Sequence, residues 1–401
     1  MTGSPFNQDL LERFAQSPAG FIEERALSRD RFLRMGLPEK RGPFQYFPLS
    51  QLYGASFRNG SAVFRGCEEN TLIFLDGEFK PELSRLSNLK DLVILPLEEA
   101  QRSYHSILSR RLSQSASEEK DPFALLNLSL HNRGAFVFIP PNALIKNPIR
   151  AVHYISRPCF PRVQLFVGAR ARVEWISTVI QDAPQPLWSS LVFDAALDEG
   201  AEVHLTQNYT LSPESFLFDA TRVALKKQAR FTAVAVHKGS RALRQDYHLH
   251  LAGEEAAAEL FGLSLLEDNR QAHVHVRMEH EAPHCRSRQH FKGVLRDHSQ
   301  SSFEGKIYVH PEAQKTEAYQ LNNHLILGER AIANSKPNLE IFADDVKASH
   351  GATVSQLRAD ELFYLQARGI SQETAKQLLT RAFCREIIEK IPHAELRSLW
   401  L

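Results

Sequence analysis

The sequence predicts a mainly β protein with a helical region at each end, and two observations support this prediction. Apolar residues recur with a period of two from about residue 135 to residue 354, as they do in half-buried strands. On both sides of this stretch they recur at the i, i+3, i+4 and i+7 spacing of an amphipathic helix. We therefore divide the chain into a helical and mixed region (1–120), a β core (121–355) and a helical region (356–401).

Composition and charge exclude several classes of protein. The 401 residues are 43% hydrophobic and 24% charged, as in an ordinary globular protein. The net charge of +1 gives the whole molecule no attraction to nucleic acid or to an anionic membrane. No apolar run approaches the roughly 20 residues that span a bilayer, and the N-terminus has no secretory signal pattern.

The cysteines indicate the cellular compartment. Cys67, Cys159, Cys285 and Cys384 are widely separated, and no CxxC motif occurs. A disulfide framework is not expected from such spacing, so we predict a cytoplasmic protein. A single chain that holds an iron–sulfur cluster normally supplies about four thiolates, often close together. A cluster bound here would need ligands from a second chain.

The N-terminal region begins with a helical pattern from Phe6 to Met35, which Gly36-Leu37-Pro38 ends. A strand is expected at Thr71–Leu75, followed by an Asp76-Gly77 turn. The polar stretch Ser113–Lys120 predicts an exposed loop or linker before the β core.

The β core contains several alternating segments, divided by glycine-containing turns at intervals of roughly 25 to 45 residues. A parallel β-helix would produce this pattern, because each coil buries its apolar face on the next. An antiparallel sandwich would produce it too, and the period does not distinguish them. The clearest segments start at Phe136, Arg172, Glu202, Arg230 and His273.

The C-terminal region predicts a short helix at Asp360–Arg368, closed by Gly369, and a second helix capped by Ser371 with Glu373 in its first turn. The second helix has one apolar face, which either packs on the chain's own sheet or docks a partner. This face comprises Ala375, Leu378, Leu379, Ala382, Phe383 and Ile387.

Residues 280–284 match the zinc-protease motif HExxH. That motif requires a helix, which places both histidines on one side of the metal. Pro283 lies inside the motif and the flanking segments are strand-like, so we do not expect a metalloprotease. A wider cluster of His280, His284, Cys285 and His290 is a weaker metal candidate, against the simpler interpretation of hydrogen-bonded histidines on a sheet.

Other catalytic patterns are missing from the sequence. It contains no phosphate-binding loop for ATP, no dinucleotide fingerprint and no nucleophile elbow. Asp344 and Asp345 form an acidic pair, but adjacent strand residues point to opposite faces. We expect a protein that is not an enzyme.

The segments Gly305-Lys-Ile-Tyr-Val-His-Pro and Gln320-Leu-Asn-Asn-His-Leu begin a series of matches to one known family. From Gly305 onward the chain resembles the SufB/SufD family of iron–sulfur cluster assembly scaffolds. The matches continue with Lys336-Pro-Asn-Leu-Glu-Ile-Phe-Ala-Asp-Asp-Val-Lys-Ala-Ser-His-Gly-Ala-Thr-Val and Leu362-Phe-Tyr-Leu-Gln-Ala-Arg-Gly-Ile. Within the family, Ser349-His350-Gly351-Ala352-Thr353 is most similar to the D-type subunit.

The resemblance implies a right-handed parallel β-helix core with helical ends. It also implies pairing with a SufB-like paralogue. It further implies that a SufC-like ABC ATPase docks on the C-terminal helices, through Phe363 and the apolar face of the helix capped by Ser371. It implies no tightly bound cofactor, and it suggests His350 as a ligand of a transient iron or iron–sulfur cluster shared with the partner. Many relatives carry cysteine two residues before this histidine, whereas this chain has Ala348.

Two other functions remain as alternatives. A polysaccharide-acting β-helix enzyme would need a groove of convergent carboxylates and aromatic residues, which the sequence does not indicate. A homodimeric scaffold would replace the pair of paralogues by two copies of this chain. Such pairing is reasonable because the exposed end of a β-helix offers free strand edges.

Overall fold

The structure is a computed structural model that describes residues 5–15, 22–89, 91–130, 133–181 and 185–400. Its strands form two sheets. Sheet A contains β1 (Thr71–Leu75), β2 (Glu78–Phe79), β5 (Ile149–Tyr154), β7 (Arg172–Gln181), β9 (Glu202–Leu211), β11 (Arg230–His237), β13 (Ala257–Leu266), β15 (Arg286–Leu295), β17 (Thr316–Ile326) and β19 (Val346–Ser355). Sheet B contains β3 (Val93–Pro96), β4 (Gly134–Ile139), β6 (Arg162–Val167), β8 (Trp188–Leu197), β10 (Phe216–Leu225), β12 (Ala242–Leu251), β14 (Gln271–His280), β16 (Gln300–Val309) and β18 (Ile332–Ile341).

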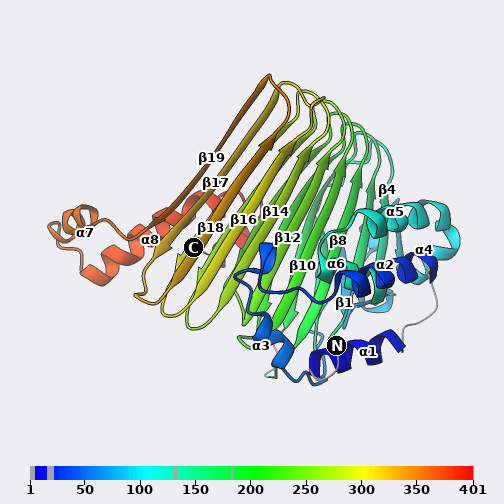
Figure 1. Cartoon of the computed structure of the whole chain (residues 1–401), viewed down its shortest axis with the longest axis horizontal. Coiled ribbons are helices and arrows are strands. Elements are labelled where there is room, and N and C mark those ends of the chain that lie inside the picture. Colours follow the sequence, from blue (N-terminus) through cyan, green and yellow to red (C-terminus); the bar gives the residue numbers. More distant parts are fainter. Residues whose placement is uncertain (1–4, 16–21, 90, 131–132, 182–184, 401) are drawn as a thin grey trace.

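The chain alternates between the two sheets, so that each consecutive pair of strands from β4 to β19 makes one coil of a parallel β-helix (Figure 1). Neighbouring coils pair in parallel and in register: Arg230 pairs with Ala257, 27 residues later, and Arg286 with Glu317, 31 residues later. This confirms the expected β-helix and excludes the antiparallel sandwich. The inward side chains fill the space between the sheets, with large ones such as Trp175, Phe231 and Phe303 almost fully buried.

The turns that lead from sheet B to sheet A repeat one backbone feature. Each contains a residue with positive φ, and its amide donates to a carbonyl in the corresponding turn of the next coil. For Gln228, φ is +57° and the amide donates to the Glu254 carbonyl at 2.8 Å. The feature continues the ladder of hydrogen bonds around the corner of every coil. In the turns from β4–β5 to β16–β17, the residues concerned are Asn142, Arg170, Gly200, Gln228, Glu255, His284 and Lys315.

Replacing Gln228 by valine should lower the free energy of unfolding by about 1–2 kcal/mol, because a β-branched residue is strained at positive φ. Replacement by asparagine should leave it nearly unchanged, since asparagine tolerates this conformation. Urea denaturation of the two variants beside the parent chain measures the difference. If valine and asparagine lowered the free energy of unfolding equally, the positive φ of the turn would not be the cause of the destabilisation.

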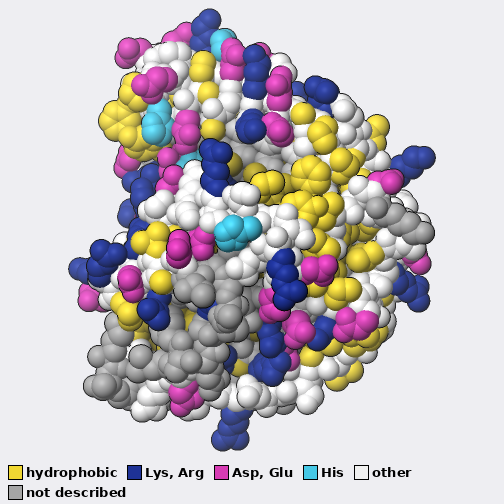
Figure 2. Space-filling view, turned by 90° about the vertical axis from the view of Figure 1, so that its right-hand side faces the viewer, with side chains coloured by type: hydrophobic (Ala, Val, Ile, Leu, Met, Phe, Trp, Pro, Cys, Tyr) yellow, Lys and Arg dark blue, Asp and Glu magenta, His cyan; other side chains and the backbone are white. Residues whose placement is uncertain are grey.

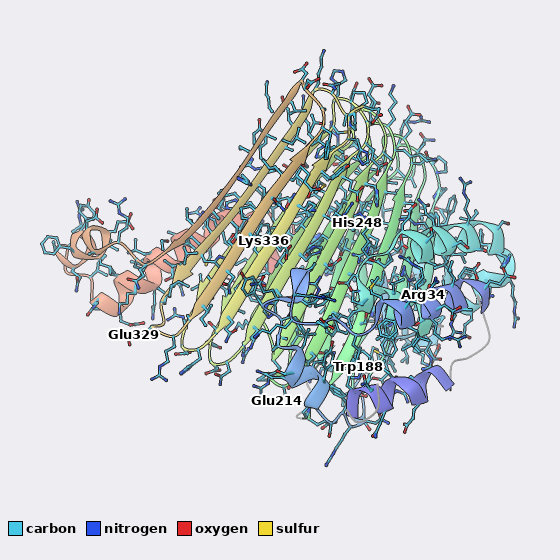
Figure 3. The ribbon with its side chains drawn as sticks, viewed as in Figure 1. Arg34, Trp188, Glu214, His248, Glu329 and Lys336 are labelled. Carbon is cyan, nitrogen blue, oxygen red and sulfur yellow. The ribbon has the colours of Figure 1, made fainter. Side chains whose placement is uncertain are left out.

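Helices cover the part of the outer face of sheet B that lies toward the N-terminal end of the β-helix (Figure 1). The helices α1 (Pro5–Ala15), α2 (Ile22–Met35), α3 (Leu49–Gly54) and α6 (Pro122–Leu130) contribute to an apolar layer that includes Trp188, Phe216 and Phe218 of the sheet. Figure 3 shows Trp188 close to these helices. Short 3₁₀ turns lie at η1 (Gly42–Phe44), η2 (Pro81–Leu83) and η3 (Ser87–Leu89).

Most N-terminal predictions are confirmed. The first helical pattern is two helices, α1 and α2, with residues 16–21 between them outside the described residues. The second helix ends at Met35, followed by Gly36 with φ of +75°. The strand Thr71–Leu75 turns through Asp76 and Gly77 into β2, as expected.

The loop predicted at Ser113–Lys120 was wrong. Residues 113–118 belong to α5 (His105–Glu118), which follows α4 (Leu97–Ser103). Leu108, Leu112 and Ala116 recur at i, i+4 and i+8 and are buried, so tertiary packing keeps this polar stretch helical. Figure 2 looks onto the end of the molecule that carries α4 and α5, where charged side chains of both signs surround a band of hydrophobic ones.

The C-terminal helices are α7 (Ala359–Gln366), α8 (Gln372–Ile388) and α9 (Ala394–Ser398). The predicted signals are confirmed: Gly369 has φ of +84°, and the Ser371 hydroxyl accepts from the Thr374 amide at 3.2 Å. The helix α8 packs on the outer face of sheet A, whereas α7 projects beyond it (Figure 1). Within the described parts of the chain, no helix combines the length and apolar character needed to cross a membrane.

Candidate functional site

The C-terminal end of the β-helix is the candidate site, because both sheets end there in an edge strand. In sheet A the last strand is β19, and in sheet B it is β18. Each pairs on one side only among the described strands, so one edge of each presents backbone donors and acceptors. Such edges are templates for pairing with another chain.

Large apolar side chains are exposed around these edges. Phe342 is 57% exposed and Val354 is 54% exposed, although neighbouring coils bury most residues of this kind. A patch of this size and position is typical of an interaction surface. Its exposed members are Tyr319, Leu321, Ile332, Ile341, Phe342 and Val354.

His350 lies in the middle of β19. It is in register with Gln320 of β17, which is in register with Gln289 of β15. The Nε2 atom of Gln320 donates to the side-chain Oε1 atom of Gln289 at 2.9 Å. Residues in register on parallel strands share a face, so His350 occupies the last position of an inward-facing polar column. Gln289 and Gln320 are buried, whereas His350 is exposed because no further coil covers it.

The interior beneath this end is polar. The His324 imidazole lies 3.1 Å from the Ser301 hydroxyl and is buried, and burial lowers the pKa of His324 to about 4. The side-chain oxygens of Gln320, Asn322 and Ser335 are enclosed without a hydrogen-bond partner among the described residues. An imidazole at the open end of this polar column is a chemically suitable iron ligand, because neutral imidazole binds iron and ligates cluster iron in Rieske centres.

The chain's own thiols do not supplement this histidine. Burial raises the pKa of Cys159 to about 12 and those of Cys285 and Cys384 to about 11, so these thiols are protonated at neutral pH. The shallow groove beside His350 on the outer face of sheet A is formed by residues of β15, β17 and β19, with no cysteine among its described lining residues. Ala348, two residues before His350, pairs with Ala318.

The residues of the HExxH match do not converge. His280 is buried at the end of β14, and its imidazole lies 2.8 Å from the Ser287 hydroxyl. His284 is exposed and occupies the positive-φ position of the following turn, as described above. Cys285 is buried in the core, and His290 lies under α8, where its ring is 3.3 Å from Glu386. The wider metal cluster drawn from the sequence is therefore not brought together.

The predicted docking face on α8 is divided by the fold. Ala375 and Ile387 are buried, the latter against sheet A, and Phe383 is half-buried with Lys292 over its ring at 4.8 Å. Leu378 and Ala382 are exposed and Leu379 is half-buried. On α7, Phe363 is 72% exposed. The free apolar surface in this region thus lies on α7 and the first half of α8.

A group of residues that the sequence reasoning missed lies elsewhere, on the outer face of sheet B. Five side chains from three successive coils lie close together there, although they match no spacing motif. They are His248, His250, Glu279, Glu281 and His310. The only sequence signals are the alternations His248-Leu-His250 and Glu279-His-Glu281.

Comparison with known proteins identifies the family. A family model described as "SUF system FeS cluster assembly, SufBD core domain" matches residues 152–383, and the "SufBD protein N-terminal region" matches residues 65–151. The chain belongs to the SufBD family. It is therefore a SufBD-family protein of iron–sulfur cluster assembly, and the resemblance seen in the sequence is confirmed.

Three relatives illustrate the extent of the similarity. The SufBD family protein slr0076 of Synechocystis is 31% identical, over 94% of this chain and 89% of the relative. The protein SufD of Escherichia coli is 27% identical, over 92% and 88%. The chloroplastic protein ABCI7 of Arabidopsis thaliana is 30% identical, over 65% and 58%.

Proposed function

We propose that this SufBD-family chain is the D-type, non-catalytic scaffold subunit of a cytoplasmic iron–sulfur cluster assembly complex. It pairs with a SufB-like paralogue through the C-terminal end of its β-helix. A transient iron or iron–sulfur cluster forms at the junction, with His350 as this chain's ligand and thiolates from the paralogue. A SufC-like ABC ATPase docks on the C-terminal helices.

The observation that carries the proposal is the position of His350 on a free edge strand. The unpaired edges of β18 and β19 are surrounded by exposed apolar side chains, which favours continuation of both sheets into a second β-helix. A partner on these edges would cover the open end of the polar column and enclose His350. Shared ligands between two chains also fit the buried, protonated state of three of the four cysteines.

The projection of α7 supports the docking site of the ATPase. Phe363, Tyr364 and Leu378 expose apolar surface on α7 and the first half of α8, while the second half of α8 is anchored on sheet A. An ATPase bound to this surface would move the helices and, through the anchored half, shift the strands beneath it, β15 and β13, which lie two and three strands from the edge of sheet A. ATP-driven movement of this kind would open the scaffold for cluster formation.

Co-purification tests the composition of the complex. The tagged chain, with and without residues 359–401, is isolated from its native cytosol. We expect the full chain to recover a larger paralogue and an ABC ATPase, and the shortened chain to keep the paralogue and lose the ATPase. A second control, Phe363→Asp with Leu378→Asp, should lose the ATPase without removing the anchor of α8. Recovery of neither protein by the full chain would contradict the proposal.

Cluster loading tests His350. In the assembled complex, His350→Ala should reduce the iron and sulfide bound after reconstitution by at least about tenfold, a loss seen even for groups that only support metal ligands. The side chain is exposed in the isolated chain, so the unfolding midpoint of that chain should be unchanged. Size-exclusion chromatography of the complex checks that the variant still pairs with the paralogue. Thr353→Ala, three residues along the same strand, is the matched control. Normal loading in His350→Ala would exclude the ligand role.

A further inference from the structure

A second group of metal-ligating side chains lies on the outer face of sheet B, where β12, β14 and β16 end. His248 and His250 alternate with buried Leu249 and Leu251, so both histidines point outward. Glu279 is the register partner of His250 on the next strand. The adjacent turns add Glu281 and His310. The β-helix thus stacks imidazole and carboxylate groups from three successive coils at one place.

These side chains are close enough to share one ion. The Nε2 atom of His248 lies 2.9 Å from Glu279 Oε1, and the rings of His248 and His250 are 4.3 Å apart between centroids. The ligand atoms of His248, His250 and Glu279 all lie within 4.8 Å of one another. Ligand atoms of a tetrahedral site with bonds of about 2.0–2.1 Å lie roughly 3.4 Å apart, so small rotations of side chains suffice.

One polar atom at this place has no hydrogen-bond partner. The Nε2 atom of His310 is enclosed and accepts or donates no hydrogen bond among the described residues, and it lies 3.6 Å from Glu279 Oε2. Enclosed polar atoms normally have a partner, so this imidazole nitrogen is available to bind a ligand beside the carboxylate. His310 and Glu281 also lie with Glu279 in a second group, whose ligand atoms are within 4.8 Å of one another.

The surroundings set the accessibility of the place. A hollow between the end of α5 and sheet B is lined by His248, His250, Glu279 and Glu281, so an ion can reach them from solvent. Figure 3 labels His248 on this face of sheet B, beside the helical cover. The ring of His250 has its Nδ1 atom 2.6 Å from Glu281 Oε1, which orients its Nε2 atom as a ligand.

We propose that His248, His250 and Glu279 bind a divalent transition-metal ion, with His310 as a fourth ligand and Glu281 as the group that orients His250. Two imidazoles and a carboxylate suit Zn²⁺ and Fe²⁺, whereas Mg²⁺ and Ca²⁺ prefer oxygen ligands. The site lies on the outer face of sheet B and uses no residue of the edge strands. It is therefore independent of the function proposed for His350.

One arginine competes with the ion for the Glu279 carboxylate. The Nε atom of Arg277 donates to Glu279 Oε1, so the ion takes Oε2, the oxygen that faces His310, or displaces Arg277. Arg222 also lines the hollow, but Glu119 and Asp246 already neutralise it.

The test uses the full-length, tag-free chain after treatment with a chelator. Titration with Co²⁺, followed by visible absorption, should show one bound ion per chain with the spectrum of a site with nitrogen and oxygen ligands. Zn²⁺ and, under anaerobic conditions, Fe²⁺ should displace Co²⁺, whereas Mg²⁺ should not. The relative strength of the two displacing ions tells which one the site prefers.

Matched variants locate the ion. The double variant His248→Ala with His250→Ala should weaken Co²⁺ binding at least about tenfold, and Glu279→Gln, which keeps the size of the side chain, should do the same. His298→Ala removes an exposed histidine from another turn and His350→Ala removes the proposed cluster ligand, and both should bind like the parent chain. Absence of Co²⁺ binding by the parent, unchanged binding in Glu279→Gln, or loss only in His350→Ala would each overturn the proposal.

Discussion

Acidification from pH 7 to pH 5 should remove most of the stability of this chain, because it buries several neutral histidines. Burial lowers the pKa of His153 and His273 to about 3, and those of His237, His280 and His324 to about 4. In the unfolded chain their pKa is about 6.5. Below that pH the unfolded chain takes up protons that the folded chain cannot, so falling pH favours unfolding.

The size of the effect follows from the pKa differences. The stability is fully present above pH 6.5 and is lost progressively as the pH falls toward the folded-state values. At pH 5 each histidine accounts for about 2 kcal/mol, and the five together for on the order of 10 kcal/mol, as large as the whole stability of a typical domain. Asp219 acts in the opposite direction, since burial raises its pKa to about 6, but it is a single group.

Urea denaturation at pH 7, 6 and 5 measures this dependence. Substituting His280 or His324 by glutamine keeps a polar side chain beside the serine that each imidazole contacts and removes the group that titrates. Each variant should lose about 2 kcal/mol less than the parent between pH 7 and pH 5. His284→Gln changes an exposed histidine and should follow the parent curve. Parallel curves for all of these chains would contradict the assignment to buried histidines.

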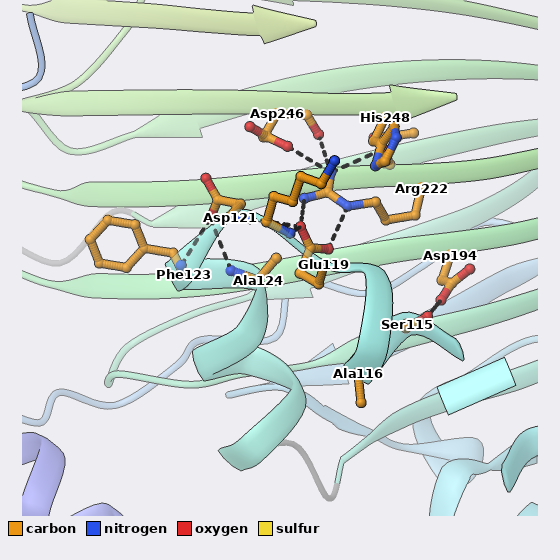
Figure 4. Close-up of polar contacts among 12 residues, drawn as sticks. Ser115, Ala116, Glu119, Asp121, Phe123, Ala124, Asp194, Arg222, Asp246 and His248 are labelled. Atoms are coloured by element: carbon orange, nitrogen blue, oxygen red, sulfur yellow. Dashed lines mark hydrogen bonds and ion pairs between the residues drawn. The ribbon is translucent and has the colours of Figure 1, made fainter. Parts of the chain in front are cut away.

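Removal of Arg222 should be the most destabilising single substitution of a charged residue that we predict. The Nε atom of Arg222 lies 2.7 Å from Glu119 Oε2, and its Nη1 atom lies 2.8 Å from Asp246 Oδ1 (Figure 4). All three side chains are buried. Burial by itself raises the pKa values of Glu119 and Asp246, but the nearby Arg222 outweighs it. The pKa of Glu119 is below its ordinary value, and the pKa of Asp246 is well below its ordinary value. The network ties the end of α5 to β10 and β12.

Arg222→Met should lower the free energy of unfolding by about 3–5 kcal/mol, because it leaves two buried carboxylates without their main partner. The triple variant that adds Glu119→Gln and Asp246→Asn should recover part of the loss, since no uncompensated charge remains. Urea denaturation at pH 7 gives these values. Arg385→Met breaks an exposed pair with Glu389 and should change stability by less than about 0.5 kcal/mol. A similarly small change for Arg222→Met would exclude the buried network as a main contribution to the free energy of unfolding.

The sequence by itself determined the class of fold and the family. The period of two from residue 135 to residue 354 indicates strands with one buried and one outer face. It depends only on neighbouring residues, so it can be read from the sequence. The end signals of the C-terminal helices are local too, so Gly369 and Ser371 were placed correctly. The segments around His350 that are typical of the family can be recognised in the sequence alone, and the two family models confirm the family.

Only the tertiary structure decided which residues meet. The helix at residues 113–118 exists because Leu112 and Ala116 pack into a shared core, a contact that its polar composition hides. Ile387 was placed on a docking face but lies against sheet A, because a helical period does not say what the apolar face contacts. His248, Glu279 and His310 come together because in-register coils stack residues about 30 positions apart. That register depends on the length of every turn, which no single stretch of sequence encodes.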